Sequence, residues 1–408
     1  MVELLSPGGS FISLRAALRN GADSVYIGLK DNNMRTNTSN FSIEDIKKAS
    51  QIAKEYSSKI YLCTNTMMKD EDIKLIESYL PIIKEAEIDA LIVSDIGLAD
   101  LAIENDFEVH ISVQENTSNI KTLKTLKKLG VTRAILSREL NISEIKKIAN
   151  NSPIETEVFI HGAMCMAISG RCFLSYGLYN KSANCGECLQ PCRKQWKLTI
   201  AQDKDSHFYE KCEDSVSILG KSSDSSYKSN FLSPYDMSMI EHIPELIETG
   251  VDAFKIEGRA RSPDYVATTT RVYKEAIDSY DSGNYKFRPE WINDLKKVFN
   301  RGFDTGFYFK QPYKTDGDNK SEFFKKDIAK VVNYYSKIKV AELQIWDDLA
   351  IGDEIVIQGK TTGSVSQLIK SMEIDGVAID YCKKGNNVAI AIDNKVRAND
   401  FVYKLIKR

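Results

Sequence analysis

The sequence predicts an α/β fold: a TIM-like (β/α)8 barrel with a Cys-rich insertion, followed by a small C-terminal all-β barrel domain. First, short β-branched or apolar runs alternate with amphipathic stretches up to residue 258, which is typical of βαβ units and a parallel sheet. Second, no Gly-rich phosphate loop follows the first run, which favours a barrel over a doubly wound sheet. Third, short runs separated by turn signals begin at about Asp327 and indicate an all-β domain.

Eight segments have the composition of barrel strands: Val2–Ser6, Ser24–Leu29, Lys59–Asn65, Ala90–Asp95, Glu108–Ser112, Arg133–Ser137, Glu157–Gly162 and Ala253–Gly258. Helices are expected over Ser42–Glu55, Asp70–Glu85, Ile120–Leu129, Ser143–Ala149 and Pro263–Tyr280. Ser42 and Ser143 stand just before acidic residues, which predicts a helix start at each serine.

A chain of 408 residues is too long for a single average core. We expect a barrel over residues 1–285 that includes a Cys-rich excursion over 161–230, a connector over 286–326 and the β domain over 327–408. Inside the excursion, Gln202–Asn230 is rich in Ser, Asp and Lys, which predicts a hairpin with a mobile tip or a disordered loop.

Composition excludes several classes of protein. The apolar share of 42% and the charged share of 27% are ordinary for a globular protein. No apolar stretch approaches the roughly 18 residues of a membrane span, and the start of the chain does not resemble a secretion signal. We therefore expect a cytoplasmic protein without a membrane partner, in which clustered cysteines are metal ligands before they are disulfides. The net charge of −2 gives no case for nucleic-acid binding.

Polar residues follow the ends of the predicted strands, where TIM barrels carry their active sites. They are Asn65, Asp95, Gln114, Arg138 with Glu139, His161, Asp236, and Glu257 with Arg259. A capping or loop role is the commoner explanation for any one of them, but the set as a whole is unusually polar and favours a site. Further along, Arg301 lies among aromatic residues that either stack a base or substrate ring or pack under the barrel.

Five of the eight cysteines fall between Glu155 and Trp196: Cys165, Cys172, Cys185, Cys188 and Cys192. A zinc site typically uses two close pairs, and only Cys185 and Cys188 have that spacing. A catalytic thiol needs a nearby histidine, for which His161 is the candidate. An iron–sulfur cluster takes four thiolates at irregular spacings. The spacing alone leaves zinc and iron–sulfur open.

The segment FIHGAMCMAISGRCFLS, followed by NCGECLQPCR, closely resembles the signature of the collagenase-like peptidase U-32 family. The start VELLSPGG, the middle HISVQENTSN and the later IEHIPELIETGVDAFKIEGRARSPDYV also resemble that family, so the likeness covers nearly the whole chain. Despite its name, the family includes oxygen-independent hydroxylases. Length and the appended β domain are most similar to the branch that hydroxylates the wobble uridine of tRNA in a prephenate-dependent reaction.

The resemblance implies a four-iron four-sulfur (4Fe-4S) cluster on Cys165, Cys172, Cys188 and Cys192, with zinc as the runner-up. Cys185 is extra, and Ser238 stands where some relatives have a ligand cysteine. In this interpretation the residues with catalytic roles are His161, Gln114, Arg138, Glu257 and Arg259. Those expected to bind substrate are Asn65, Asp95, Asp236 and Arg301.

The expected partners are tRNA and a homologous partner subunit, and prephenate is the expected co-substrate. Three alternatives stay open: a collagenase-like peptidase, a hydroxylase of a ribosomal-RNA base or a ubiquinone precursor, and a non-catalytic RNA-binding subunit with a structural metal. Against a peptidase, the sequence has neither a Gly-x-Ser-x-Gly elbow nor a His-Glu-x-x-His helix.

Overall fold

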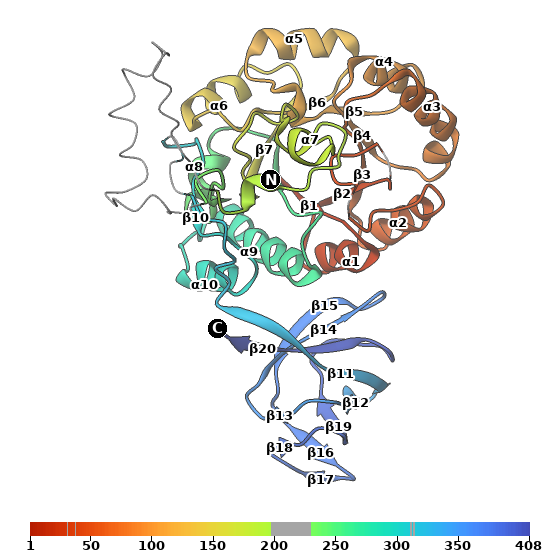
Figure 1. Cartoon of the computed structure of the whole chain (residues 1–408), viewed down its shortest axis with the longest axis vertical. Helices are drawn as coiled ribbons and strands as arrows, with labels where there is room; N and C mark the ends of the chain where they lie inside the picture. Colours follow the sequence, from red (N-terminus) through yellow and green to blue (C-terminus); the bar gives the residue numbers. More distant parts are fainter. Residues whose placement is uncertain (31, 37, 197–229, 311, 313–314) are drawn as a thin grey trace, which may run out of the picture.

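A computed structural model of the chain describes residues 1–30, 32–36, 38–196, 230–310, 312 and 315–408. The predicted barrel is confirmed, and all eight predicted strands are present in it (Figure 1). They are β1 (Glu3–Pro7), β2 (Ser24–Gly28), β3 (Lys59–Thr64), β4 (Ala90–Val93), β5 (Val109–Ile111), β6 (Arg133–Ile135), β7 (Glu155–Gly162) and β9 (Ala253–Ile256). Each pairs in parallel with the next, and β9 closes the ring by pairing with both β7 and β1.

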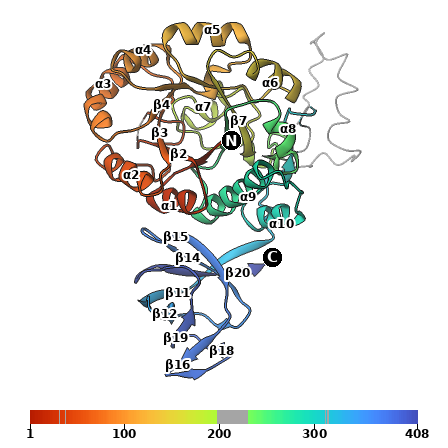
Figure 2. The ribbon, with the colours of Figure 1, turned by 180° about the vertical axis from the view of Figure 1, so that it is seen from behind.

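Helices surround this barrel on the outside (Figures 1 and 2). They are α1 (Phe11–Arg19), α2 (Asp45–Lys54), α3 (Asp70–Glu85), α4 (Ile96–Glu104), α5 (Ile120–Leu129), α6 (Ile142–Ala149), α8 (Ile243–Ile247) and α9 (Pro263–Asp281). The bounds of α3 and α5 are those predicted, but the two serine start signals were wrong. Asn141 caps α6, because its side chain accepts from the backbone N–H groups of Ser143 and Glu144 at 3.0 Å each. Ser42 lies outside α2 and donates to Asp45 Oδ2 at 3.0 Å.

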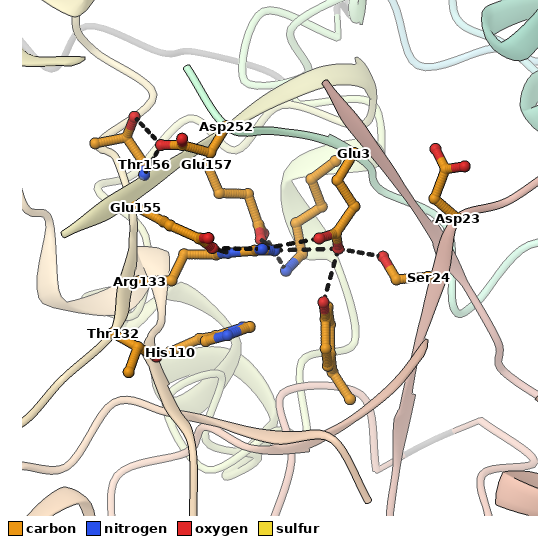
Figure 3. Close-up of polar contacts among 12 residues, drawn as sticks. Glu3, Asp23, Ser24, His110, Thr132, Arg133, Glu155, Thr156, Glu157 and Asp252 are labelled. Carbon is orange, nitrogen blue, oxygen red and sulfur yellow. Dashed lines mark hydrogen bonds and ion pairs between the residues drawn. The ribbon is translucent and has the colours of Figure 1, made fainter. Parts of the chain in front are cut away.

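The end of the barrel where the strands begin is filled by a buried network of charges instead of an apolar layer (Figure 3). Arg133 contacts Glu3 at 2.8 Å and Glu157 at 3.4 Å, and Lys255 contacts Glu157 at 2.7 Å. Tyr61 donates to Glu3 at 2.8 Å. Burial by itself would raise the pKa of Glu3, but the hydrogen bond and charge of Arg133 outweigh it and lower this pKa to about 2. Glu3 therefore stays ionised at neutral pH.

Beyond the barrel, two short strands widen the sheet beside β7. The antiparallel partner of β7 is β8 (Asp236–Ser238), and β10 (Phe303–Asp304) pairs in parallel with β8. Residues 286–326, predicted as a connector, contain α10 (Pro289–Lys297) as well as β10. The hairpin or disordered loop predicted over Gln202–Asn230 lies, apart from Asn230, outside the described residues.

The C-terminal part is all-β, as predicted, and its first strand begins at Phe323. The antiparallel sheet has the order β15-β14-β20-β11-β12-β19-β16-β17, with β13 and β18 paired apart from it. The strands are β11 (Phe323–Tyr335), β12 (Val340–Ile345), β13 (Leu349–Ala350), β14 (Glu354–Gly359), β15 (Gly363–Leu368), β16 (Met372–Ile374), β17 (Val377–Ala378), β18 (Tyr381–Cys382), β19 (Asn387–Ala391) and β20 (Phe401–Lys407). Strand β15 lies against α1 and α9 of the barrel (Figure 2).

Across the described ranges, every helix is too short or too polar to cross a membrane.

Candidate functional site at the barrel mouth

After β7 the chain folds back over the ends of the barrel strands instead of entering a helix directly. Residues 163–196, the part of the predicted Cys-rich segment that the structure describes after β7, lie over these strand ends, and the name excursion is used for them from here on. Hydrogen bonds connect the excursion to the loops that follow several strands. Met67 N donates to Asn184 O at 3.1 Å, and Asn116 Nδ2 donates to Ser169 O at 3.2 Å. The excursion therefore covers the face on which TIM barrels carry their active sites.

The four cysteines predicted as ligands line one cavity of about 220 Å³ under the excursion. They are Cys165, Cys172, Cys188 and Cys192. Burial raises the pKa of Cys188 and Cys192, and the nearby thiols of Cys165 and Cys172 raise both further. Cys185 is not among the described residues that line this cavity. The four predicted cysteines therefore share one cavity, and the extra cysteine, Cys185, does not line it.

This donor set suits a group held by four thiolates, which is what an iron–sulfur cluster requires. Within the described part of the chain, no three His, Cys, Asp or Glu side chains stand close enough together to hold a single metal ion. A tetrahedral zinc ion would bring its sulfurs to about 3.8 Å of one another, given Zn–S bonds of about 2.3 Å. The four thiols around this cavity have the number and kind of donors that a 4Fe-4S cluster takes, and a zinc ion takes donors of the same kind.

A second cavity, of about 90 Å³, shares Arg35, Cys165 and Gly170 with the cysteine cavity. Four cationic side chains line it: Arg35, Arg138, Lys255 and Arg259. One carboxylate, Glu257, faces them and pairs with Arg35 at 3.0 Å. Burial alone would raise the pKa of Glu257, but the charges of Arg35, Arg261 and Arg138 outweigh it and lower this pKa. We call this space the cationic cavity.

Several donors of the cationic cavity lack a partner. Arg35 Nε, Arg138 Nε and Arg259 Nη1 are buried without a hydrogen bond, whereas Arg138 Nη1 donates to Ala163 O at 2.8 Å. Each unsatisfied buried donor costs about 1–3 kcal/mol. Guanidinium groups bind carboxylates with two parallel hydrogen bonds, so this lining suits an anionic ligand that carries carboxylates.

Two amide side chains complete the wall of the cationic cavity. Asn65 Nδ2 donates to Ser112 Oγ at 3.0 Å and to Gln114 Oε1 at 3.3 Å, and both amides also line a third hollow of about 250 Å³ at the rim. Asp95 lies in that outer hollow, but its carboxylate caps α4 by accepting from Leu98 N at 2.9 Å. Asn65 and Gln114 line the space that a bound molecule would occupy. The Asp95 carboxylate is engaged in capping α4.

Three predicted site residues lie elsewhere. His161 is enclosed by aromatic rings and has its Nδ1 3.2 Å from Tyr273 Oη. Burial lowers its pKa to about 3, so it is neutral at pH 7. Asp236 and Arg301 form a buried ion pair at 3.2 Å, with the Arg301 guanidinium 4.8 Å from the Phe299 ring. Arg301 was considered either for stacking a base or substrate ring or for packing under the barrel, and its buried ion pair and ring contact are those of a packed residue.

Sequence reasoning missed Arg35 and Lys255. Arg35 stands in a polar loop without a motif, and only the fold shows that it reaches Glu257. Lys255 did carry a signal, because it is a charged residue inside the apolar strand β9, a position that needs a buried partner. Its Nζ meets Glu157 and lies 4.5 Å from the centre of the Tyr26 ring.

Comparisons with known proteins cover nearly the whole chain. A sequence model described as Peptidase family U32 matches residues 9–318. A Methanocaldococcus jannaschii protein named as an uncharacterized protease is 46% identical over 99% of this chain and 98% of its own. A collagenase of Porphyromonas gingivalis is 36% identical, with 100% and 98% covered. The tRNA hydroxylation protein P1 of Bacillus subtilis is 33% identical, with 98% and 94% covered.

Proposed function

The chain belongs to peptidase family U32, and from this premise we propose that it is an enzyme that hydroxylates the wobble uridine of tRNA. The observation that carries the proposal is the wall shared by two cavities, one lined by four thiols and the other by four cationic side chains. This pairing suits a cofactor beside an anionic co-substrate. A relative named for tRNA hydroxylation, which is similar over 94% of its length, supports the choice of substrate.

In the proposed enzyme, Cys165, Cys172, Cys188 and Cys192 hold a 4Fe-4S cluster, which supplies one-electron redox chemistry when bound. Cys185 has no part in this set. The excursion contributes most of the wall of the cysteine cavity, and Arg35, which lines both cavities, pairs with Glu257 of the cationic cavity. That pairing keeps the guanidinium charge fixed between the two cavities.

We propose that the cationic cavity binds prephenate, a dicarboxylate. Arg35, Arg138 and Arg259 hold the carboxylates, and Lys255 adds positive charge at the bottom of the cavity. Asn65 and Gln114 orient the polar groups of the bound molecule from the rim. The target base enters from outside, because chemistry on a base requires removing it from its stack.

Replacing Arg259 by lysine keeps the charge but removes the guanidinium fork. Hydrogen bonds to charged groups contribute about 1.5–3 kcal/mol, so we expect the KM for prephenate to rise about tenfold to a hundredfold. Iron content should not change. The control is Arg261→Lys, because Arg261 stacks 3.9 Å from the Phe299 ring and is not among the described residues that line the cationic cavity. Equal KM values for Arg259→Lys and the wild type would contradict the assignment.

The proposed function is tested by nucleoside analysis of total tRNA from a deletion strain. We expect the hydroxylated wobble uridine and its derivatives to disappear and to return when the wild-type gene is supplied. A strain with a second route to the same modification would mask the effect, so that route is deleted in both strains. An unchanged nucleoside profile would refute the proposal.

The alternative peptidase activity draws on the relative named collagenase. A cysteine peptidase would need His161 beside a thiol, but the aromatic rings around it and its contact with Tyr273 make His161 part of the packing. Cleavage of gelatin by protein free of iron would favour this second function.

A further inference from the structure

The outer surface of the excursion carries large aromatic side chains that pack poorly against the rest of the protein. Phe173 is 75% exposed, Tyr176 53% and Tyr179 41%. Helix α7 (Leu174–Tyr179) carries the two tyrosines, and spacings of three residues place Phe173, Tyr176 and Tyr179 along one side of it. Large exposed apolar side chains gathered on one side of a helix are typical of an interaction site.

We propose that Phe173, Tyr176 and Tyr179, together with Lys194, form a platform on which unpaired bases of the RNA substrate stack. This inference rests on the proposed function, since it assigns the surface that receives the tRNA. We call these four residues the stacking platform.

The stacking platform is fixed in place beside the cysteine cavity. Cys172 directly precedes Phe173, and Leu174 lines the cavity itself. Leu189 N donates to the buried Ser175 Oγ at 3.1 Å, which joins α7 to the segment that carries Cys188 and Cys192. In Figure 1, α7 lies over the opening of the barrel. A base held on this surface is therefore next to the entrance of the site.

Charge on the excursion favours RNA over a protein partner. Residues 163–196 contain four basic residues (Arg171, Lys181, Arg193 and Lys194) against one acidic residue, Glu187, a net charge of 4 − 1 = +3, whereas the whole chain carries −2. Lys194 Nζ lies 5.1 Å from the centre of the Tyr179 ring and 3.2 Å from its hydroxyl. Alternating aromatic rings and cations are typical of surfaces that bind single-stranded nucleic acid, whereas charged residues are depleted at the core of protein interfaces.

The test measures binding of a fluorescent anticodon stem–loop RNA, with uridine at the wobble position, to the full chain purified with its cofactor under anaerobic conditions. Loss of one stacked base weakens binding about fivefold to a hundredfold. We expect this loss for Phe173→Ala and Phe173→Leu, and affinity close to wild type for Phe173→Tyr, which keeps a ring. The slope of log Kd against log salt concentration should not change, because no phosphate contact is removed.

A matched control is Leu129→Ala. Leu129 is 37% exposed and ends α5, at the end of the barrel where the strands begin. Its substitution removes exposed apolar surface away from the mouth, and RNA affinity should not change.

Three results would overturn the stacking platform. One is equal RNA affinity for wild type, Phe173→Ala and Phe173→Leu while wobble-uridine hydroxylation proceeds; the proposed function would then stand without it. Another is a change in oligomeric state for Phe173→Ala with RNA affinity unchanged, which would identify a protein interface. The third is no RNA binding and no hydroxylation by the wild type, and this would refute the proposed function as well.

Discussion

The Cys188→Ala variant is expected to lose its bound iron and, with it, tRNA hydroxylation. Cys188 lines the cysteine cavity with three other thiols, so the substitution removes one of the four thiolates proposed to hold the cluster. Removing a group that only hydrogen-bonds to a metal ligand lowers metal affinity about 10- to 100-fold. Removing a ligand itself should lower the affinity for the cluster by at least that factor, so the purified variant should carry less iron than the wild type. Iron and sulfide analysis after anaerobic purification measures this directly.

The excursion supplies its own control for this experiment. Cys185 lies three residues before Cys188 but is not among the described residues of the cysteine cavity, so Cys185→Ala should keep iron, sulfide and activity. Zinc in place of iron in the wild type would contradict the 4Fe-4S assignment. Equal iron loss in both variants would show that Cys185 is a ligand after all.

The barrel was predictable because its strands are short runs of β-branched and apolar residues, such as ALIV in β4, separated by amphipathic helices. The four cysteine positions came from the resemblance and not from their spacing, and the fold brings the same four into one cavity. Helix starts were less certain. Serine, asparagine and aspartate all cap helices, and a single sequence does not show which neighbour does so.

The position of His161 could not be read from the sequence because it depends on strand register. Side chains alternate between the two faces of a strand, and Glu157 and Phe159 both point into the barrel. Glu157 contacts Lys255 there, and Phe159 lines the cationic cavity. Simple alternation would send His161 inward as well. The pairing of β7 with β9 shifts between Phe159 and His161, and the imidazole lies instead against Tyr273 of α9.

The buried network of charges at the end of the barrel where the strands begin gives the second prediction, which concerns the stability of the fold. Glu157 has no exposed side-chain surface and pairs with both Lys255 and Arg133. Glu157→Gln keeps the shape but removes the charge that offsets two buried cations. Breaking a buried pair on one side costs about 3–5 kcal/mol, and we expect a loss of that size in the free energy of unfolding, measured by urea unfolding followed by circular dichroism.

Glu155 is a control for Glu157, because it pairs with the same arginine but is partly exposed. The comparison tests whether burial of the carboxylate decides how much stability is lost. Glu155 also contacts Arg133, at 2.6 Å, but its side chain is 49% exposed, so Glu155→Gln should cost less than about 1 kcal/mol. Adding Lys255→Met to Glu157→Gln removes one of the stranded cations and should recover part of the lost stability. Prephenate binding should weaken in the double variant, because Lys255 also lines the cationic cavity. If the double variant is no more stable than Glu157→Gln, Lys255 is not the cation that Glu157 compensates.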